Sequence, residues 1–490
     1  GYDEDDFVVT AAEGFGDPQN NYAFSSAKFK GDTYVGTGRN FLYRVFNALQ
    51  TAGVLPADYE YTYITHPEGE AWSEQLASEM SAEIWRYHHK SWEKVYVSDP
   101  MDVGGSGLPY PPSPAYAAKE PGFRSMITFT DKWGEEAIYA ASAASLVPGR
   151  LLIKSTDGTT WNDVMTGPLM ESDSRSMAVH NGKLYIGPSG LSRTATIWVT
   201  DDPVTGGDGS NWVKVADFTE EGPGRNVTVT SMVSLNGYLY AGTQNDEGGF
   251  QLWKSNAGIP SSPSLGEWTR IIDSGAGDMG NTRALTMTAF KGDLIVGTSM
   301  FPLATEFPWI LAPKGFELLR VSRADSWDLL IGDYFAQKPP DGIPTLRTPK
   351  SGWPGGFGNF LNIYCWSLHP ANEYLYLGTF DMSSFLYVLM MDADSENPPP
   401  ATALGAMSRA LESTGYNAGS ASFGRDMSLL ESLGIETSML DPGNGLPDLE
   451  NILYQYAGAD IWKTKDGVHW VPVTLNGFGN PENYGIRTML

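Results

Sequence analysis

Apolar and polar residues alternate along most of this chain in short stretches, and each stretch ends at a glycine-containing turn. In Ser25 to Gly38, small or polar residues alternate with apolar ones up to Lys30-Gly31, and a run rich in Tyr and Val then ends at Gly36-Thr37. This pattern predicts a tight β-hairpin. The same element recurs at residues 175–190, 230–245, 285–300 and 366–380, and in degenerate form at 124–142.

A second hairpin follows each copy of the first, and a tryptophan opens its outer strand in every copy. These second hairpins cover residues 83–99, 151–167, 196–218, 252–274, 317–333 and 461–476. Two hairpins per repeat make four strands, and the repeat occurs six times in series. We therefore predict an all-β fold, a single β-propeller domain over residues 1–490, with four-stranded blades around a central channel and the tryptophans packed between blades.

The two ends of the chain carry parts of one further repeat. Residues 7–22 are similar to residues 471–485, which gives Phe7 to Ala11 the pattern of an outer strand, and Tyr484 to Leu490 has the pattern of an inner strand. We therefore predict seven blade positions, with a six-bladed ring as the alternative. The two missing strands are expected either from a continuation of the natural chain past Leu490 or from another copy, which would be self-association through the incomplete C-terminal blade.

Two heptapeptides, at residues 155–161 (STDGTTW) and 464–470 (TKDGVHW), resemble the Asp-box turn of sialidase-like propellers, shortened by one residue. The resemblance implies a structural role, with the Asp and Gly forming the turn and the Trp packing between blades, for Asp157, Trp161, Asp466 and Trp470. The whole chain also resembles a family of secreted bacterial β-propellers, mostly uncharacterised, that carry Gly-Phe-Gly-(Asp/Asn)-Pro-x-Asn before an inner strand, as at 14–20 and 477–483. That resemblance implies the architecture and offers no reaction.

Composition excludes several classes of function. The net charge of −26, from 32 basic and 58 acidic residues, argues against binding to nucleic acid or to an anionic membrane, because both need a basic surface. The single cysteine, Cys365, excludes an internal disulfide, and no stretch of about 18 apolar residues is available to span a membrane. Gly1 and the acidic run after it resemble the start of a mature chain after signal-peptide removal, so we expect an extracellular protein, secreted or on the cell surface.

Long insertions occur in the loops on one face of the predicted propeller, whereas the turns on the other face are tight. The insertions are residues 41–82, 100–121, 299–315, 334–361 and 382–459. The last contains two stretches with helical spacing and is predicted to form a helical cap, which would be a lid, an oligomer contact or a packed insertion without further role. The carboxylates of Asp392, Asp394 and Glu396 at its start are candidate calcium ligands, although the spacing of a known calcium loop is missing.

Arginines recur at one position of the repeat. Alignment on the turn glycines brings seven residues to an equivalent place near the loop-bearing end of the channel: Phe24, Arg124, Arg175, Thr230, Leu285, Trp366 and Arg487. Arg283 lies two residues earlier on its strand and is expected on the same side, with Tyr22 and Tyr364 at the same mouth. Such guanidinium groups are suited to hold a carboxylate or a sulfate. The alternative is that they pair with local carboxylates such as Asp173 or Glu171 and close the channel.

These observations leave two functional hypotheses. The first is a non-catalytic extracellular propeller that binds a ligand or assembles with copies of itself, because the sequence contains no recognisable Ser/His/Asp or metal-binding constellation. The second is a polysaccharide-active enzyme, a lyase or hydrolase on acidic glycans. In that case, the arginine-lined channel mouth would neutralise an anionic sugar, the tyrosines would move a proton, and calcium would be a candidate cofactor.

Overall fold

The structure is a computed structural model, and the account below covers the residues whose placement it describes. These are residues 1–44, 47, 66–105, 113–256, 267–300, 314–384 and 457–490, apart from 144, 148, 150, 165, 167, 168, 170, 191 and 205–207. The candidate calcium ligands Asp392, Asp394 and Glu396 and most of the predicted helical cap lie outside the described residues.

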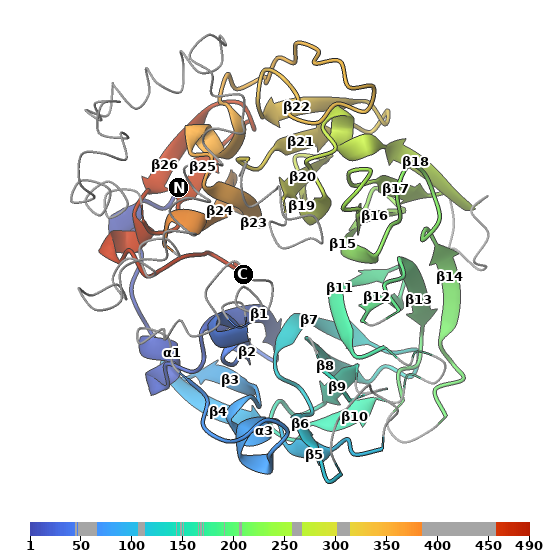
Figure 1. Ribbon diagram of the computed structural model, residues 1–490, viewed down its shortest axis with the longest axis vertical. Helices are drawn as coiled ribbons and strands as arrows, with labels where there is room; N and C mark the ends of the chain where they lie inside the picture. The colour runs from blue at the N-terminus through green and yellow to red at the C-terminus, as the bar shows by residue number, and fades with distance from the viewer. Residues whose placement is uncertain are drawn as a thin grey trace.

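The described chain forms six four-stranded antiparallel units in sequence order (Figure 1). The first contains β1 (Tyr22–Phe29), β2 (Asp32–Gly38), β3 (Glu83–His88) and β4 (Ser91–Val97); the second β7 (Phe123–Thr130), β8 (Glu136–Ser142), β9 (Leu152–Ser155) and β10 (Asn162–Val164); the third β11 (Asp173–His180), β12 (Lys183–Ser189), β13 (Thr196–Thr200) and β14 (Val213–Asp217). The others are β15 (Thr228–Leu235), β16 (Tyr238–Gln244), β17 (Leu252–Ser255) and β18 (Trp268–Ile272); β19 (Arg283–Phe290), β20 (Asp293–Ser299), β21 (Leu318–Val321) and β22 (Trp327–Ile331); and β23 (Asn362–Ala371), β24 (Tyr374–Asp381), β25 (Ile461–Thr464) and β26 (Trp470–Thr474). This arrangement of sheets is that of a β-propeller.

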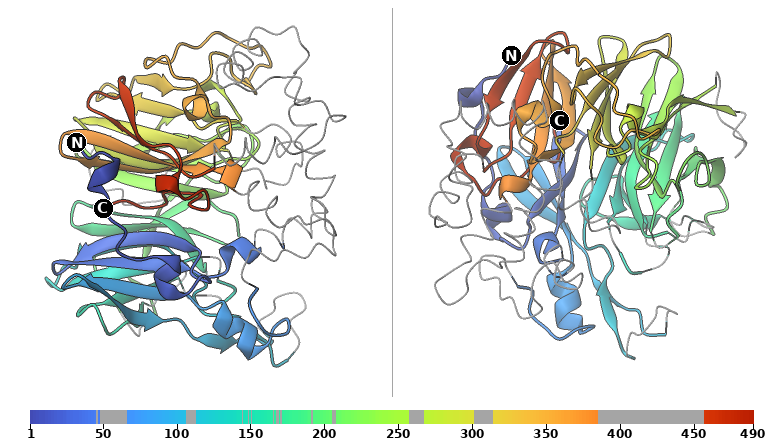
Figure 2. Two further views of the ribbon diagram at one scale, coloured as in Figure 1. Left: turned by 90° about the vertical axis from the view of Figure 1, so that its left-hand side faces the viewer. Right: turned by 45° about the horizontal axis from the view of Figure 1, so that its top comes forward.

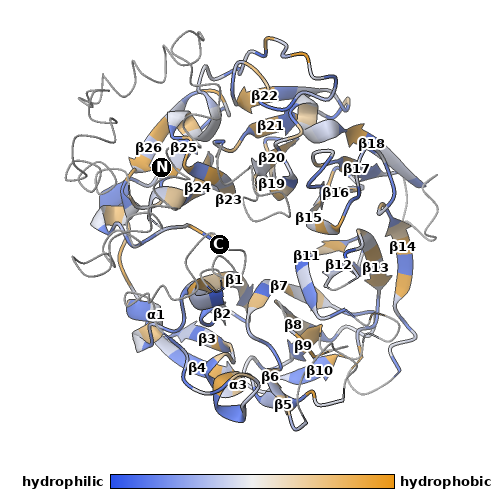
Figure 3. Cartoon of the chain, in the orientation of Figure 1, coloured by the Kyte–Doolittle hydropathy of each residue, from blue (hydrophilic) through white to orange (hydrophobic). Residues whose placement is uncertain are grey.

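The hydrophobic core lies between neighbouring units of the ring, whose strands carry recurring apolar residues (Figure 3). One buried cluster joins the third unit to the fourth through Tyr185, Phe218 and Trp253, and another joins the fifth to the sixth through Phe316 and Trp462. Equivalent clusters join the other neighbours from the first unit to the fifth. Burial of apolar surface between sheets therefore fixes the order of the units around the channel.

Every inner strand contains a β-bulge at the same place in the repeat. In β1 the register shifts between Ala23 and Ser25, and the same shift recurs in β7, β11, β15, β19 and β23. A bulge adds one unpaired residue and redirects its side chain. The six bulged residues are those that alignment of the sequence placed together: Phe24, Arg124, Arg175, Thr230, Leu285 and Trp366.

A glycine faces most of these bulges because the next inner strand packs closely against it. A Cβ added to Gly187 would lie 2.9 Å from Cβ of Val229, and one added to Gly242 would lie 2.5 Å from Cβ of Ala284. The glycine near the end of the second strand of the repeat thus allows close packing between units.

The C-terminal segment occupies the place of a further inner strand, between β23 and β1 (Figure 1). A Cβ on Gly378 would lie 2.5 Å from Cβ of Ile486, and the hydroxyl of Ser367 donates to the carbonyl of Ile486 at 2.6 Å, as Ser176 donates to Val229. Arg487 therefore takes the position of the bulged residues.

The predicted outer strand from Phe7 to Ala11 is wrong. Residues 7–11 have no strand structure, and the side chains of Val8 and Val9 are 80% and 78% exposed. An isolated strand without hydrogen-bonded neighbours is not stable in water, and none of the described strands pairs with this segment. It instead connects the sixth unit to the first, where the indole of Trp92 donates to Thr10 at 3.3 Å.

Short elements protrude from the ring at the loops that the sequence analysis marked as insertions. A side view shows α3 (Glu74–Glu79) and the small sheet of β5 (Pro100–Asp102) and β6 (Tyr116–Ala118) on one side of the sheets (Figure 2). No helix in the described part of the chain is long and apolar enough to cross a membrane.

Asparagines fix the turns that lead into several inner strands. The turns α1 (Glu13–Gly16), η3 (Ser274–Gly277), η5 (Gly355–Gly358) and η7 (Gly477–Gly479) each contain left-handed backbone, and the amide of an Asn six residues later donates to a glycine carbonyl in each turn. Asn20 and Asn362 also donate to the acidic residue at or next to the start of the third strand, Glu83 at 2.8 Å and Asp460 at 2.8 Å. The turn, the inner strand and the third strand are therefore held as one unit.

Asp460 is expected to make stability depend on pH. Burial raises the pKa of Asp460 to about 6, although hydrogen bonds from Asn362 and Trp462 oppose the shift. The folded protein then binds a proton more tightly than the unfolded chain, so the free energy of unfolding should fall as pH rises from about 4 to about 6. Asp460→Asn should remove this slope and stabilise the protein above pH 6 by up to about 3 kcal/mol, measured by urea unfolding across this range.

Asp466→Asn provides a control of opposite sign. Partial burial acts to raise the pKa of Asp466, but hydrogen bonds from His469 and Val468 prevail and lower it below the ordinary value. The ionised carboxylate stabilises the folded protein above its unfolded pKa, and this stabilisation is lost on acidification. Asp466→Asn should therefore have a lower free energy of unfolding than the wild type at neutral pH. Equal pH slopes for wild type and Asp460→Asn would contradict the prediction.

Candidate functional site

The central channel is the candidate site, and the aligned position of the repeat lines it. Its volume is about 210 Å³. All seven residues of the aligned position contact it: Phe24, Arg124, Arg175, Thr230, Leu285, Trp366 and Arg487. The hydroxyl-bearing residues that follow the bulges also line the wall.

The wall differs from one side to the other. Arg124 and Arg175 project from β7 and β11, whereas β15 and β19 contribute the neutral Thr230 and Leu285. On the remaining side Phe24, Trp366 and Tyr22 form an aromatic cluster, with ring centroids 4.9 Å apart for Tyr22 and Phe24 and 5.7 Å apart for Tyr22 and Trp366. The channel therefore presents a cationic sector next to an aromatic one.

The predicted arginines differ in their partners. Arg124 forms an ion pair with Asp173 at 2.5 Å, so the alternative of pairing with a local carboxylate holds for this residue. Among the described residues, Arg175 has neither a hydrogen-bond acceptor nor an ion-pair partner. The guanidinium of Arg487 lies over the rings of Phe24, at 5.6 Å, and Trp366, at 5.8 Å, and it too lacks an acceptor within the part of the chain that the structure describes.

Mutual repulsion and burial disfavour the charged state of these guanidinium groups. Burial, followed by the charges of Arg124 and Arg283, lowers the pKa of Arg175 well below its ordinary value, and nearby Asp173 compensates only in part. Burial and Arg124 lower the pKa of Arg487 to about 10. A bound anion would reverse these shifts, because opposite charge favours the cationic form.

Arg283 and the two predicted tyrosines lie in the adjacent layer, two residues before the bulged position. Arg283 is 4% exposed and hydrogen-bonds to Tyr364. It does not line the channel, because the bulge interrupts the two-residue alternation on which its expected orientation relied. Burial raises the pKa of Tyr364 and, with the phenol of Tyr364 nearby, that of Tyr22, so both phenols stay protonated at neutral pH.

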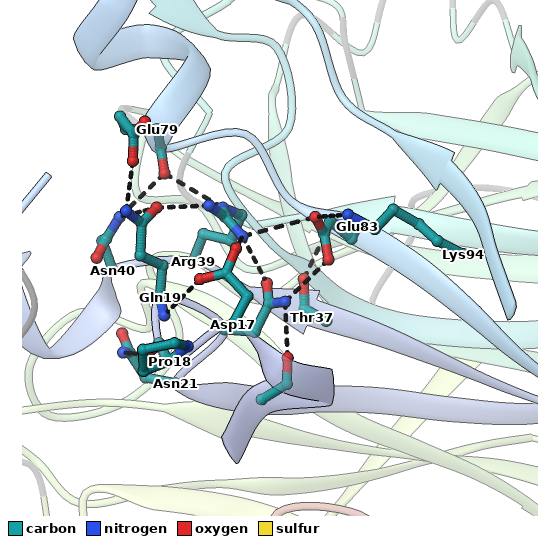
Figure 4. Close-up of polar contacts among 12 residues, drawn as sticks. Asp17, Pro18, Gln19, Asn21, Thr37, Arg39, Asn40, Glu79, Glu83 and Lys94 are labelled. Atoms are coloured by element: carbon teal, nitrogen blue, oxygen red, sulfur yellow. Dashed lines mark hydrogen bonds and ion pairs between the residues drawn. The ribbon is translucent and has the colours of Figure 1, made fainter. Parts of the chain in front are cut away.

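Arg39 shows the contacts of a guanidinium group whose hydrogen-bond donors have protein acceptors (Figure 4). Arg39 donates to Asp17 at 2.7 Å, to the carbonyl of Glu79 at 3.2 Å and to Asn20 at 3.2 Å, and it lies 3.6 Å from Glu83. This network joins the turn before β1 to the start of β3. The contrast indicates that Arg175 and Arg487 differ from an arginine that serves the fold.

Sequence reasoning missed Arg44. It follows the first inner hairpin at the start of the insertion at 41–82, stacks over Phe41 at 5.4 Å, and has its pKa lowered to about 10 by burial and by Arg124. Because no other repeat has a counterpart to this residue, alignment of the repeats gave no signal for it. The bulge that redirects the aligned residues was also missed, since a bulge leaves no distinct mark in a single sequence.

The structural residues of the repeat lie in turns and between units. The carboxylate of Asp157 accepts from the backbone of Thr159 and Thr160 at 2.7 Å and 2.6 Å. Asp466 accepts in the same way from Val468 and His469. Trp161 packs near Tyr34 and Tyr96 of the first unit, and Trp470 lies in the cluster between the fifth and sixth units. Trp327 is the exception among the repeated tryptophans, because its side chain is 40% exposed.

Groups of three or more His, Cys, Asp or Glu side chains that could hold a metal ion do not occur among the described residues. The proposed calcium ligands Asp392, Asp394 and Glu396 fall outside that search. Calcium binding therefore remains a prediction of the sequence.

No protein-family model matches the chain, and no curated protein matches it. Among solved structures, a puromycin-hydrolyzing peptidase of Mycobacterium tuberculosis is 9% identical, with 75% of this chain and 45% of that one covered and a TM-score of 0.39. A family 43 arabinoxylan arabinofuranohydrolase of Bacillus subtilis is 13% identical, with 59% and 61% covered and a TM-score of 0.30. The α-L-arabinanase of Cellvibrio cellulosa is 14% identical, with 58% and 96% covered and a TM-score of 0.27. The chain spans less than two thirds of the length of the first two.

These neighbours correct one expectation. All three are named as hydrolases, which contradicts the hypothesis of a non-catalytic binding or self-assembling propeller, and we do not retain that hypothesis. Likenesses this distant carry no argument about which reaction this chain performs. Its chemistry has to be argued from the channel.

Proposed function

We propose that the protein is an enzyme that acts on acidic polysaccharide, as a lyase or a hydrolase, and holds the anionic group of its substrate in the arginine-lined channel. One observation carries this proposal: the guanidinium groups of Arg175 and Arg487 face a cavity of about 210 Å³ and have no acceptor among the described residues. A buried cation without a partner is costly, and a carboxylate or sulfate would form charge-assisted hydrogen bonds with it. The seventh blade position, represented by the C-terminal segment, supplies one of the two arginines.

The neighbouring groups suit chemistry at an anionic sugar. Neutralisation of a uronate by arginine lowers the barrier to removal of the adjacent carbon-bound proton, because negative charge develops on the carboxylate in the transition state. Tyr22 and Tyr364 lie in the layer next to this wall and support it: Tyr22 packs against Phe24 and Trp366, and Tyr364 hydrogen-bonds to Arg283. An extracellular location is part of this proposal, since such polymers occur outside cells.

The test is a screen of the purified protein against uronate-containing and sulfated polysaccharides. Formation of unsaturated uronate ends would identify a lyase, and new saturated reducing ends would identify a hydrolase. Arg175→Ala should lower the rate of product formation by about 100-fold or more. Arg225→Ala, which alters an exposed arginine paired with Glu220 at 3.0 Å, should leave it unchanged. Absence of product from every polymer, or equal loss in both variants, would refute the proposal.

A further inference from the structure

The wall that carries the arginines is a closed ring, and this limits how a polymer reaches them. Hydroxyl groups that follow the bulges donate to the next inner strand: Ser25 to the carbonyl of Phe123 at 2.6 Å, Ser231 to that of Ala284 at 2.7 Å, and Ser367 to that of Ile486 at 2.6 Å. The hydroxyls of Thr488 and Ser26 are 2.6 Å apart and join the C-terminal segment to β1. The arginine layer therefore has no lateral opening between the C-terminal segment and its two neighbours.

The other interfaces of the ring are closed as well. Ser176 donates to the carbonyl of Val229 at 2.9 Å between the third and fourth units, and the ion pair of Arg124 with Asp173 links β7 to β11. A bridge between Ser299 and Tyr364 links the fifth unit to the sixth. A long polymer cannot be laid into this layer from the side, as it would be in an open groove.

The arginine layer also lies below the mouth of the channel. Arg175 precedes the last residue of β11 by five positions, and a strand rises about 3.3 Å per residue, so the layer is roughly 16 Å inside the hairpin-turn end of the ring, toward which the cavity extends past Met177 and Met232. A ligand has to project into the ring by this distance before its anionic group meets Arg175 and Arg487. The terminal part of a chain can do so, whereas an internal segment would have to bend sharply.

We propose that the substrate enters the channel end first, so that the enzyme recognises the anionic terminal residue of a polysaccharide or oligosaccharide and releases short products from that end. This inference rests on the proposed function and specifies its substrate as chain ends. The closed hydrogen-bonded ring, together with the depth of Arg175 and Arg487 inside it, carries the inference.

Long and short fractions of the polymer that gives product in the screen provide the test. At equal mass, a fraction about tenfold shorter has about ten times more ends and should compete about tenfold better in binding. Short products should appear from the start, while the size distribution of the remaining polymer and the viscosity change little. Arg487→Ala should lose this binding, and Arg225→Ala should keep it.

Two outcomes separate the two proposals. Product formation with rapid loss of viscosity, and binding that follows polymer mass and not the number of ends, would overturn end-first entry and leave the proposed function standing. Failure of every polymer to give product would overturn the proposed function itself, and end-first entry with it.

Discussion

Arg175→Gln is expected to stabilise the folded protein and at the same time to abolish its response to anions. In the wild-type protein the guanidinium is partly buried near Arg124, Arg283 and Arg487, and burial together with these charges lowers its pKa. A base whose pKa is lower in the folded state costs stability at every pH at which it is charged in both states. Removal of this charge should raise the free energy of unfolding by roughly 1–3 kcal/mol in dilute chloride, the range that an unsatisfied buried group costs.

A bound anion, in contrast, should stabilise the wild-type protein more than the Arg175→Gln variant. An oligouronide or sulfate at about 100 times its dissociation constant should stabilise the wild-type protein by about 2.7 kcal/mol, and Arg175→Gln should show little of this effect. Denaturant unfolding with and without the anion, at constant ionic strength, measures both quantities.

Arg39→Gln is the matched control, because the same substitution removes an arginine with full partners. Loss of the guanidinium leaves Asp17 without its cation and removes one donor from the carbonyl of Glu79, whereas Glu83 keeps Lys94 at 2.6 Å; the cost should be roughly 1–3 kcal/mol. Stabilisation by anions should survive in this variant. If Arg175→Gln destabilises the protein as Arg39→Gln does, Arg175 serves the fold and the anion site is wrong.

Asn362→Ala should be among the most destabilising substitutions in the repeat. The Asn362 side chain is fully buried and donates to the carbonyl of Gly356 at 3.2 Å and to Asp460 at 2.8 Å. Truncation removes one donor from each of these buried groups and leaves the carboxylate with only the long bond from the indole of Trp462 at 3.5 Å, which should lower the free energy of unfolding by about 3 kcal/mol.

Asn483→Ala tests the same position of the repeat with one partner fewer. Asn483 donates to the carbonyl of Gly477 at 2.7 Å, is partly exposed, and has no acidic partner among the described residues. Its loss should cost about 1 kcal/mol. Equal costs for the two variants in denaturant unfolding would show that the bond to the third strand contributes nothing.

The repeat was predictable from sequence because its signals are local. The turn at Asn181-Gly182, the alternation along residues 175–190 and the tryptophan of each second hairpin depend on neighbours within a few residues, and the strands lie where these signals put them. Alignment of the repeats also brought Arg124, Arg175 and Arg487 to one position, because equivalent residues of a repeat occupy equivalent places around a ring. The outer strand at residues 7–11 failed, since a strand forms only where a neighbour pairs with it.

The sequence by itself determined the four-stranded repeat and the seven aligned residues that share the channel wall. Only the tertiary structure decided which arginines have hydrogen-bond or ion-pair partners. Arg124 pairs with Asp173 of the next unit, and Arg39 bonds to residues of three segments. Arg175 has no acceptor in the described chain. The tertiary structure also decided, through the bulge, that Arg283 lies behind the wall with Tyr364, and it brought Arg44 to the same cluster. Local pattern fixes hydrogen bonding along the chain, whereas the partner of a charge depends on residues that folding brings together from distant parts of the sequence.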